Sequence, residues 1–118
     1  MKTKFYTFCQ INSGGSFDYN EKDGISVHVI IEAISSVEAN EIAGNIGIYF
    51  NGCDDGIDCE CCGDRWYEAD ECGGKECPQV YGKEVKEHSK IPEEGKKWVE
   101  GYDVFIHYKN GKIIGTCK

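Results

Sequence analysis

The stretch ISVHVIIEAISSVEANEIAGNIG, residues 25–47, decides the fold because its hydrophobic period changes halfway along. Its first part, ISVHVIIEA (25–33), is a run of β-branched residues, which is typical of a central strand. Side chains alternate across a strand, so one side of the sheet is predicted to receive Val27, Val29 and Ile31. The other side is predicted to receive His28, Ile30 and Glu32.

The second part, SSVEANEIAGNIG (35–47), predicts an amphipathic helix. Its apolar residues recur at the i, i+3, i+4 and i+7 positions of a helix, namely at Ala39, Ile42, Ala43 and Ile46. Ser35 and Glu38 have the spacing of a capping box at the helix start, and Gly47 can close the helix end.

Further strands are predicted on both sides of this unit. TKFYTFCQI (3–11) reads as a strand, and the polar run NSGGSFDYNEKDG (12–24) reads as a loop. After a Cys-rich segment, QVYGKEV (79–85) is predicted to form a strand. YDVFIHYKNGKIIGTC (102–117) is predicted to form a hairpin that turns at Asn110-Gly111. The sequence therefore predicts a single α+β domain over residues 1–118, with one helix, a small antiparallel sheet and a Cys-rich insertion at 51–78.

Charge and cysteine are concentrated in this insertion. The chain carries a net charge of -8, and residues 51–78 hold nine acidic and two basic residues and six of the eight cysteines. Such an acidic chain argues against direct binding of nucleic acid. No N-terminal signal segment and no membrane span stand out, so a reducing cytoplasm is expected, where clustered cysteines more often bind metal than form disulfides.

The cysteine spacing favours a structural zinc ion. Two paired loops can supply four thiolates for a tetrahedral site, and the favoured ligands are Cys59, Cys62, Cys72 and Cys77. A single-loop site is the alternative, with Cys53, Cys59, Cys61 and Cys62 as ligands. Disulfides, or reduced and buried thiols, are further alternatives.

Asp64, Arg65, Trp66 and Tyr67 follow the first cysteine pair directly, and Arg65 is the single arginine of the chain. Arginine suits bidentate binding of a carboxylate or phosphate. In one interpretation Arg65 pairs with a carboxylate as a brace and Trp66 lies in the core. In the other, Arg65 binds an anionic ligand while Trp66 or Tyr67 stacks on its ring.

A glycine-containing loop offers a second group of donors for an anion. NSGGSF (12–17) can point backbone N–H groups of Ser13, Gly14, Gly15 and Ser16 toward such a ligand, although a simple flexible turn is the competing interpretation. The three histidines, His28, His88 and His107, have no spacing that indicates a catalytic pair. They are expected to be hydrogen-bonded or exposed.

The motifs NSGGSF, GIYFNGC (47–53) and GIDCECCGDRW (56–66) resemble those of a family of small uncharacterised proteins from tailed bacteriophages. The resemblance covers about residues 5–67 and, more loosely, the C-terminal strand. It implies a protein made in the cytoplasm of a bacterial host and not required to build the phage particle. Small phage proteins of this kind frequently act against host systems, either by sequestering a nucleotide-derived immune signal or by blocking a host protein.

Two functions follow as expectations. In the first, a non-enzymatic protein sequesters a small anionic, nucleotide-like signal through Arg65 and the 13–16 loop. Oligomerisation can help to build such a site, and its further walls are Tyr19, Tyr49 and Tyr102. In the second, a zinc-stabilised acidic module binds and inhibits a host protein.

Overall fold

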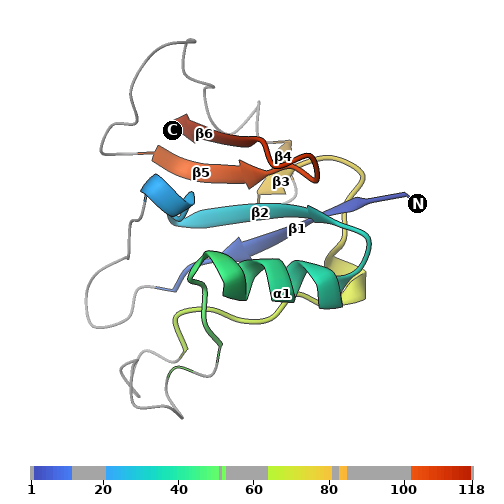
Figure 1. Ribbon diagram of the computed structural model, residues 1–118, viewed down its shortest axis with the longest axis horizontal. Helices are drawn as coiled ribbons and strands as arrows, with labels where there is room; N and C mark the ends of the chain where they lie inside the picture. Colours follow the sequence, from blue (N-terminus) through green and yellow to red (C-terminus); the bar gives the residue numbers. More distant parts are fainter. Residues whose placement is uncertain are drawn as a thin grey trace.

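The computed structural model describes residues 2–11, 21–50, 52, 64–80, 83–84 and 102–117. The four main strands are β1 (Lys4–Cys9), β2 (His28–Ala33), β5 (Tyr102–His107) and β6 (Ile113–Cys117), and the helix is α1 (Ser36–Ile46). The predicted strands at 3–11 and 25–33, the helix at 35–47 and the C-terminal hairpin are confirmed. The fold is α+β, with one helix and a four-stranded sheet (Figure 1).

The strand order is β1-β2-β5-β6, and the sheet is mixed. β1 pairs antiparallel with β2, and β5 pairs antiparallel with β6, but β2 and β5 run parallel. The prediction of an antiparallel sheet is therefore wrong for the central pair. The connection from β2 to β5 is long and contains α1, the η2 turn and the strands β3 and β4, and parallel neighbours require such a long crossover. The Asn110-Gly111 turn determines only the β5–β6 pairing.

Each face of the sheet has its own cluster of buried side chains. The face covered by α1 buries Tyr6, Phe8, Val29 and Ile31 together with Ala39, Ala43 and Trp66. The opposite face buries Ile30, Val104 and Ile106, with Phe5 and Tyr108 partly buried against them. The predicted alternation in β2 is confirmed, since Val29 and Ile31 lie on the helix side and Ile30 on the other.

The ends of α1 follow the predicted capping signals. The Ser35 hydroxyl accepts a hydrogen bond from the Glu38 N–H at 3.1 Å. The Glu38 carboxylate accepts from the Ile34 N–H at 3.2 Å, one residue before the position that a capping box uses. Gly47 ends the helix in the left-handed region at φ 113°, and its N–H returns to the carbonyls of the last turn.

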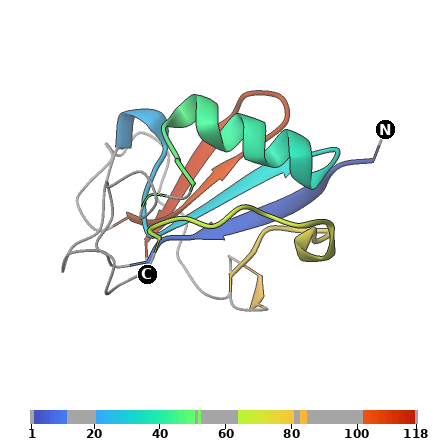
Figure 2. The same cartoon turned by 90° about the horizontal axis from the view of Figure 1, so that it is seen from below.

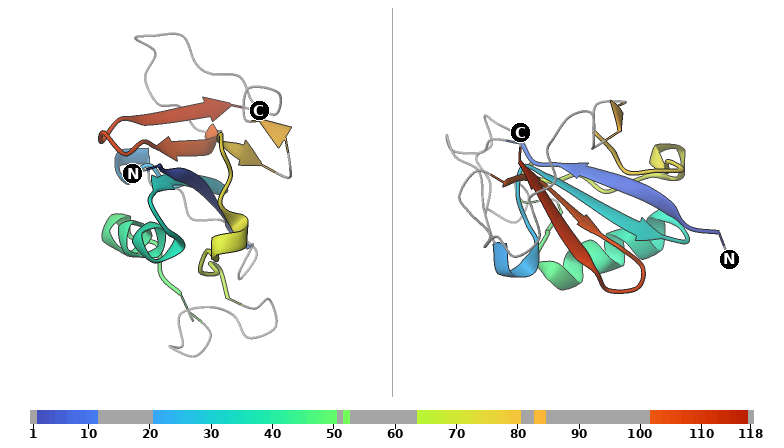
Figure 3. Two further views of the ribbon diagram at one scale, coloured as in Figure 1. Left: turned by 90° about the vertical axis from the view of Figure 1, so that its right-hand side faces the viewer. Right: turned by 90° about the horizontal axis from the view of Figure 1, so that it is seen from above.

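Shorter elements surround this framework. The 3-10 turns are η1 (Glu21–Asp23) and η2 (Glu71–Gly73), and two short strands, β3 (Gln79–Val80) and β4 (Lys83–Glu84), pair antiparallel. The single strand predicted at 79–85 is thus a small two-stranded ribbon. Figures 2 and 3 show this ribbon on the side of the sheet opposite α1. Within the described ranges, no helix has the length and hydrophobicity to cross a membrane.

Candidate functional site

Residues 64–76, which contain most of the predicted ligand-binding residues that the structure describes, run alongside the outer edge of β1. At one end the Ile11 N–H donates to the Arg65 carbonyl at 2.8 Å. At the other end Phe5 and Lys75 form an isolated antiparallel bridge, with backbone bonds of 2.8 and 2.9 Å. The segment therefore lies antiparallel to β1 (Figure 3), and backbone hydrogen bonds hold it at both ends.

Arg65 and Trp66 point into the protein. Arg65 is 8% exposed and donates from Nη1 to the Gln10 Oε1 atom at 2.9 Å, while Gln10 Nε2 donates to the Ser26 carbonyl at 3.0 Å. Trp66 is 2% exposed and belongs to the core cluster beneath α1. The Trp66 ring therefore stabilises the fold from inside, which is the placement that the brace interpretation expected.

Two side chains attach the middle of the segment to α1. Asn40 bonds the backbone of Ala69 twice, donating from Nδ2 to the carbonyl at 3.1 Å and accepting from the N–H at 2.8 Å. Glu71 accepts from the Ser36 N–H at 2.6 Å and from the Ser36 hydroxyl at 2.8 Å. A carboxylate is favourable there because the helix N-terminus carries partial positive charge.

Glu71 also joins the segment to β1. The Tyr6 hydroxyl donates to Glu71 Oε2 at 3.2 Å. Hydrogen bonds from the Ser36 backbone and hydroxyl lower the pKa of Glu71, with a smaller contribution from Tyr6. Burial, followed by the nearby Glu71 charge, raises the pKa of Tyr6. At neutral pH the carboxylate is ionised, the phenol is neutral, and both protonation states favour the observed hydrogen bond.

Exposed side chains lie on the attached segment and on the solvent side of α1. Tyr67 is 57% exposed, and Glu68 and Asp70, which follow it on the same segment, are also exposed. On α1, Val37 is 66% exposed and Glu41 is also exposed. Each comes one residue after a side chain that bonds the segment, and each lies on the solvent side of the helix. We call Val37, Glu41, Tyr67, Glu68 and Asp70 the acidic face. It combines two apolar or aromatic side chains with three carboxylates.

The predicted metal ligands are only partly described. Cys59 and Cys62 lie outside the described residues. Cys72 is an exposed free thiol on η2, and Cys77 is half-buried, with Gln79 Nε2 3.5 Å from its Sγ atom. Among the residues that the structure describes, no group of three or more Cys, His, Asp or Glu is placed to hold a metal ion.

The predicted ligand-binding loop, Ser13 to Ser16, also lies outside the described residues, whereas its point of attachment is described. Gln10 and Ile11 immediately precede that stretch of chain, and both bond Arg65. Asp64, which is half-buried, directly follows residues 53–63, which lie outside the described residues. The structure therefore places the residues that lead into the predicted 13–16 loop next to Arg65 of the predicted 64–67 segment.

Gln10, Asn40 and Glu71 were not singled out in the sequence, although they fix the position of the segment. Each acts through a partner at least 29 positions away, and local spacing carries no signal of such a pairing. The histidine expectation agrees with His107, which is buried with its Nε2 2.8 Å from the Gly24 carbonyl. His28 is buried, and His88 lies outside the described residues.

Comparison with known proteins gives a family but no activity. No curated protein and no solved structure matches this chain. One family model, described as "Domain of unknown function (DUF7296)", matches residues 3–117. This match includes all the described strands and α1. The chain therefore belongs to the DUF7296 family.

Proposed function

We propose that this protein is a non-enzymatic binding protein whose acidic face docks on a basic surface of another protein. The observation that carries the proposal is the exposure of Tyr67 (57%), on a segment held to α1 by side-chain hydrogen bonds, and of Val37 (66%) on α1 itself. A tyrosine held on a preorganised backbone is a common anchor in protein interfaces. Surrounding charges of one sign speed encounter with a partner of opposite sign and select against others.

The resemblance to tailed-phage proteins favours a bacterial host protein as the partner, blocked in the host cytoplasm. The high negative charge of the chain, -8, supports a basic docking surface, such as one that normally contacts nucleic acid. On this proposal the protein inhibits by occupying that surface, and no chemical step is required.

The test is capture of a host protein from bacterial lysate, followed by binding of the two purified proteins. The Glu68→Lys/Asp70→Lys double variant and Tyr67→Ala are each expected to weaken binding about tenfold or more. Glu76→Lys is the matched control, because Glu76 lies on the same segment but pairs with Lys2 at 3.0 Å. The proposal is wrong if the purified pair does not bind, or if charge reversal at Glu68 and Asp70 leaves the affinity unchanged.

A second candidate function is sequestration of a small anionic, nucleotide-derived host signal. The supporting observation is that Gln10 and Ile11, which lead into the 13–16 loop, both bond Arg65. Backbone donors of that loop would bind phosphate, and Tyr67 is the exposed aromatic residue available for stacking. Trp66, at 2% exposure, contributes through the core instead.

Native mass spectrometry distinguishes the two functions. Sequestration predicts a nucleotide-sized adduct that survives charge reversal at Glu68 and Asp70 but is lost when Ser13 and Ser16 are both replaced by proline, which removes two backbone donors. Protein docking predicts no such adduct and a loss of partner binding on charge reversal. An adduct that persists in the proline variant would contradict the loop assignment.

We further propose a structural zinc ion in the 51–78 segment, held by Cys59, Cys62, Cys72 and Cys77. The paired cysteine spacing supports it. Its role would be to offset part of the negative charge gathered there and to fix the segment from which Asp64 and Tyr67 project.

A further inference from the structure

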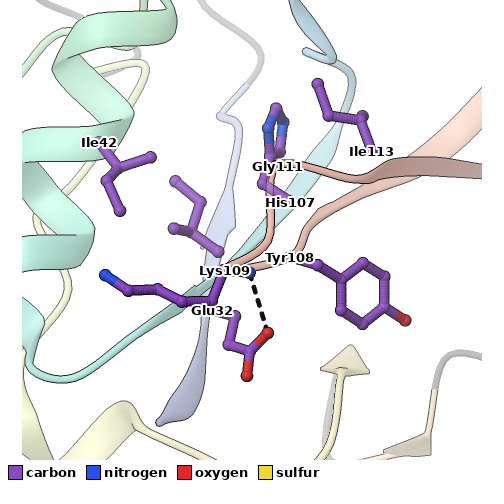
Figure 4. A pocket seen from close by; sticks show the side chains of 8 residues that line it. Glu32, Ile42, His107, Tyr108, Lys109, Gly111 and Ile113 are labelled. Atoms are coloured by element: carbon purple, nitrogen blue, oxygen red, sulfur yellow. Dashed lines mark hydrogen bonds between the residues drawn. The ribbon is translucent and has the colours of Figure 1, made fainter.

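A pocket of about 240 Å³ lies on the α1 side of the sheet, between α1 and the β5–β6 turn (Figure 4). Its origin is geometric. Four strands at a spacing of about 4.8 Å form a sheet wider than the roughly 10 Å diameter of one helix. On the β1 flank of α1, Trp66 and Ala69 fill the remaining space. On the β5–β6 flank, the pocket remains.

Three elements provide apolar walls. Ile31 comes from β2, Ile42 from α1 and Ile113 from β6, and all three line the pocket. Figure 4 shows Ile42 on the helix facing across the pocket toward the turn that carries Gly111. A site with aliphatic walls on three sides favours a flat hydrocarbon or aromatic group, because burying apolar surface is the dominant favourable term.

Hydrogen bonds and an ion pair hold the mouth of the pocket. Lys109 Nζ pairs with the Glu38 carboxylate, which links the β5–β6 turn to α1. The Lys109 N–H donates to Glu32 Oε1 at 3.0 Å, and this bond is the main cause of the lowered pKa of Glu32. Glu32 and Lys109 line the pocket, and Glu38 pairs with Lys109, so two carboxylates accompany the one ammonium of this region. This balance disfavours a small anion as the ligand.

His107 gives the pocket one directional polar group. Its Nε2 lies 2.8 Å from the Gly24 carbonyl, and because a carbonyl can only accept, Nε2 carries the proton. Burial lowers the pKa of His107, so the ring is neutral at pH 7 and Nδ1 is a hydrogen-bond acceptor. Among the described residues, no donor bonds this Nδ1 atom.

We propose that this pocket binds a small, uncharged aromatic ring with one N–H or O–H donor, of about the size of indole or phenol. The walls receive the ring, and His107 Nδ1 accepts the donor. The volume fits this class, because an apolar cavity of about 150 Å³ already holds benzene. The site is separate from the acidic face: Ile42 lines it, whereas Asn40, on the opposite flank of α1, bonds the 64–76 segment.

The test is a titration of the full ¹⁵N-labelled chain with indole, 1-methylindole and benzoate, followed by amide chemical shifts. Indole is expected to give saturable shifts at pocket residues, namely Ile31, Ile42, His107, Gly111 and Ile113. 1-Methylindole lacks the N–H donor and is expected to bind about tenfold more weakly. Benzoate is expected to give no saturable shifts there. The proposal is overturned if indole does not bind, or if 1-methylindole or benzoate binds as tightly as indole.

A pair of variants locates the site. Ile42→Phe fills the pocket from α1 and is expected to abolish indole binding, whereas Val37→Phe, on the exposed side of the same helix, is expected to leave it unchanged. Ile113→Phe fills the pocket from β6 and provides a second test that does not depend on how α1 tolerates the change. Wild-type indole binding by a folded pocket-filling variant, or its loss in Val37→Phe, would place the ligand elsewhere.

Discussion

Glu71 is the residue on which the 64–76 segment, α1 and β1 converge. Its carboxylate accepts two hydrogen bonds from Ser36 and one from Tyr6. Glu71→Gln keeps the size of the side chain but removes the charge that the helix N-terminus favours. We expect a lower midpoint of urea unfolding at pH 7. Glu68→Gln, three residues earlier and exposed, is the matched control and should change the midpoint less.

The effect of Glu71 should depend on pH in a defined direction. Its pKa in the folded protein is lowered from 4.5, chiefly by the Ser36 N–H and hydroxyl. The stabilisation is therefore fully present above the pKa of the unfolded chain and is lost as the pH falls through the lower, folded value. The midpoint difference between wild type and Glu71→Gln should narrow when urea unfolding is repeated at about pH 3. A difference that is the same at both pH values would contradict the carboxylate's role.

At the scale of elements, Gly24 joins the chain before β2 to β5. It adopts φ 73°, and a β-carbon there would lie 2.7 Å from both Cε1 and Nε2 of His107. Gly24→Ala is therefore expected to destabilise the protein by about 1–3 kcal/mol, because it combines backbone strain with a clash in a packed region. Gly44→Ala is the control: a β-carbon there meets nothing within 4 Å, and α1 should gain about 0.5–1 kcal/mol. Urea unfolding is the measurement: the free energy of unfolding should fall for Gly24→Ala and rise for Gly44→Ala.

The predictable elements were those with local signals. The change of period at residues 25–47 gave β2 and α1, and Asn110-Gly111 gave the β5–β6 hairpin. The direction of β5 relative to β2 was predicted wrongly, since strand direction depends on the path of the whole intervening chain. The pocket was also missed, because Ile31, Ile42 and Ile113 meet only once the crossover is formed.

The candidate site was less predictable than the fold for a similar reason. The sequence indicated that Asp64, Arg65, Trp66 and Tyr67 were important, but not which of them face solvent. Their environment is set by Gln10 and by contacts with α1, which place Arg65 and Trp66 inside and Tyr67 outside. An arginine beside a tryptophan can equally bind a ligand or brace a core, and only the three-dimensional partner distinguishes the two.

At the scale of the whole molecule, the uneven charge of the chain leads to the prediction of a bound zinc ion. Residues 51–78 carry nine acidic residues and six cysteines, so thiolates there would repel one another without a cation. Protein purified without chelator is expected to hold one zinc ion per chain by elemental mass spectrometry. Removing it should accelerate hydrogen exchange in 64–78 before exchange in β1 or β2 changes.

Two single substitutions test whether the predicted cysteines bind the expected zinc ion. Cys72→Ser should lower zinc affinity, since it removes one of four thiolates. Cys9→Ser is the matched control, because Cys9 lies on β1 outside the acidic segment and burial raises the pKa of its thiol, which disfavours the metal-binding thiolate. Zinc lost equally from both variants, or absent from the wild type, would contradict the site. In that case the hydrogen bonds of Gln10, Asn40 and Glu71 would hold the segment without a metal.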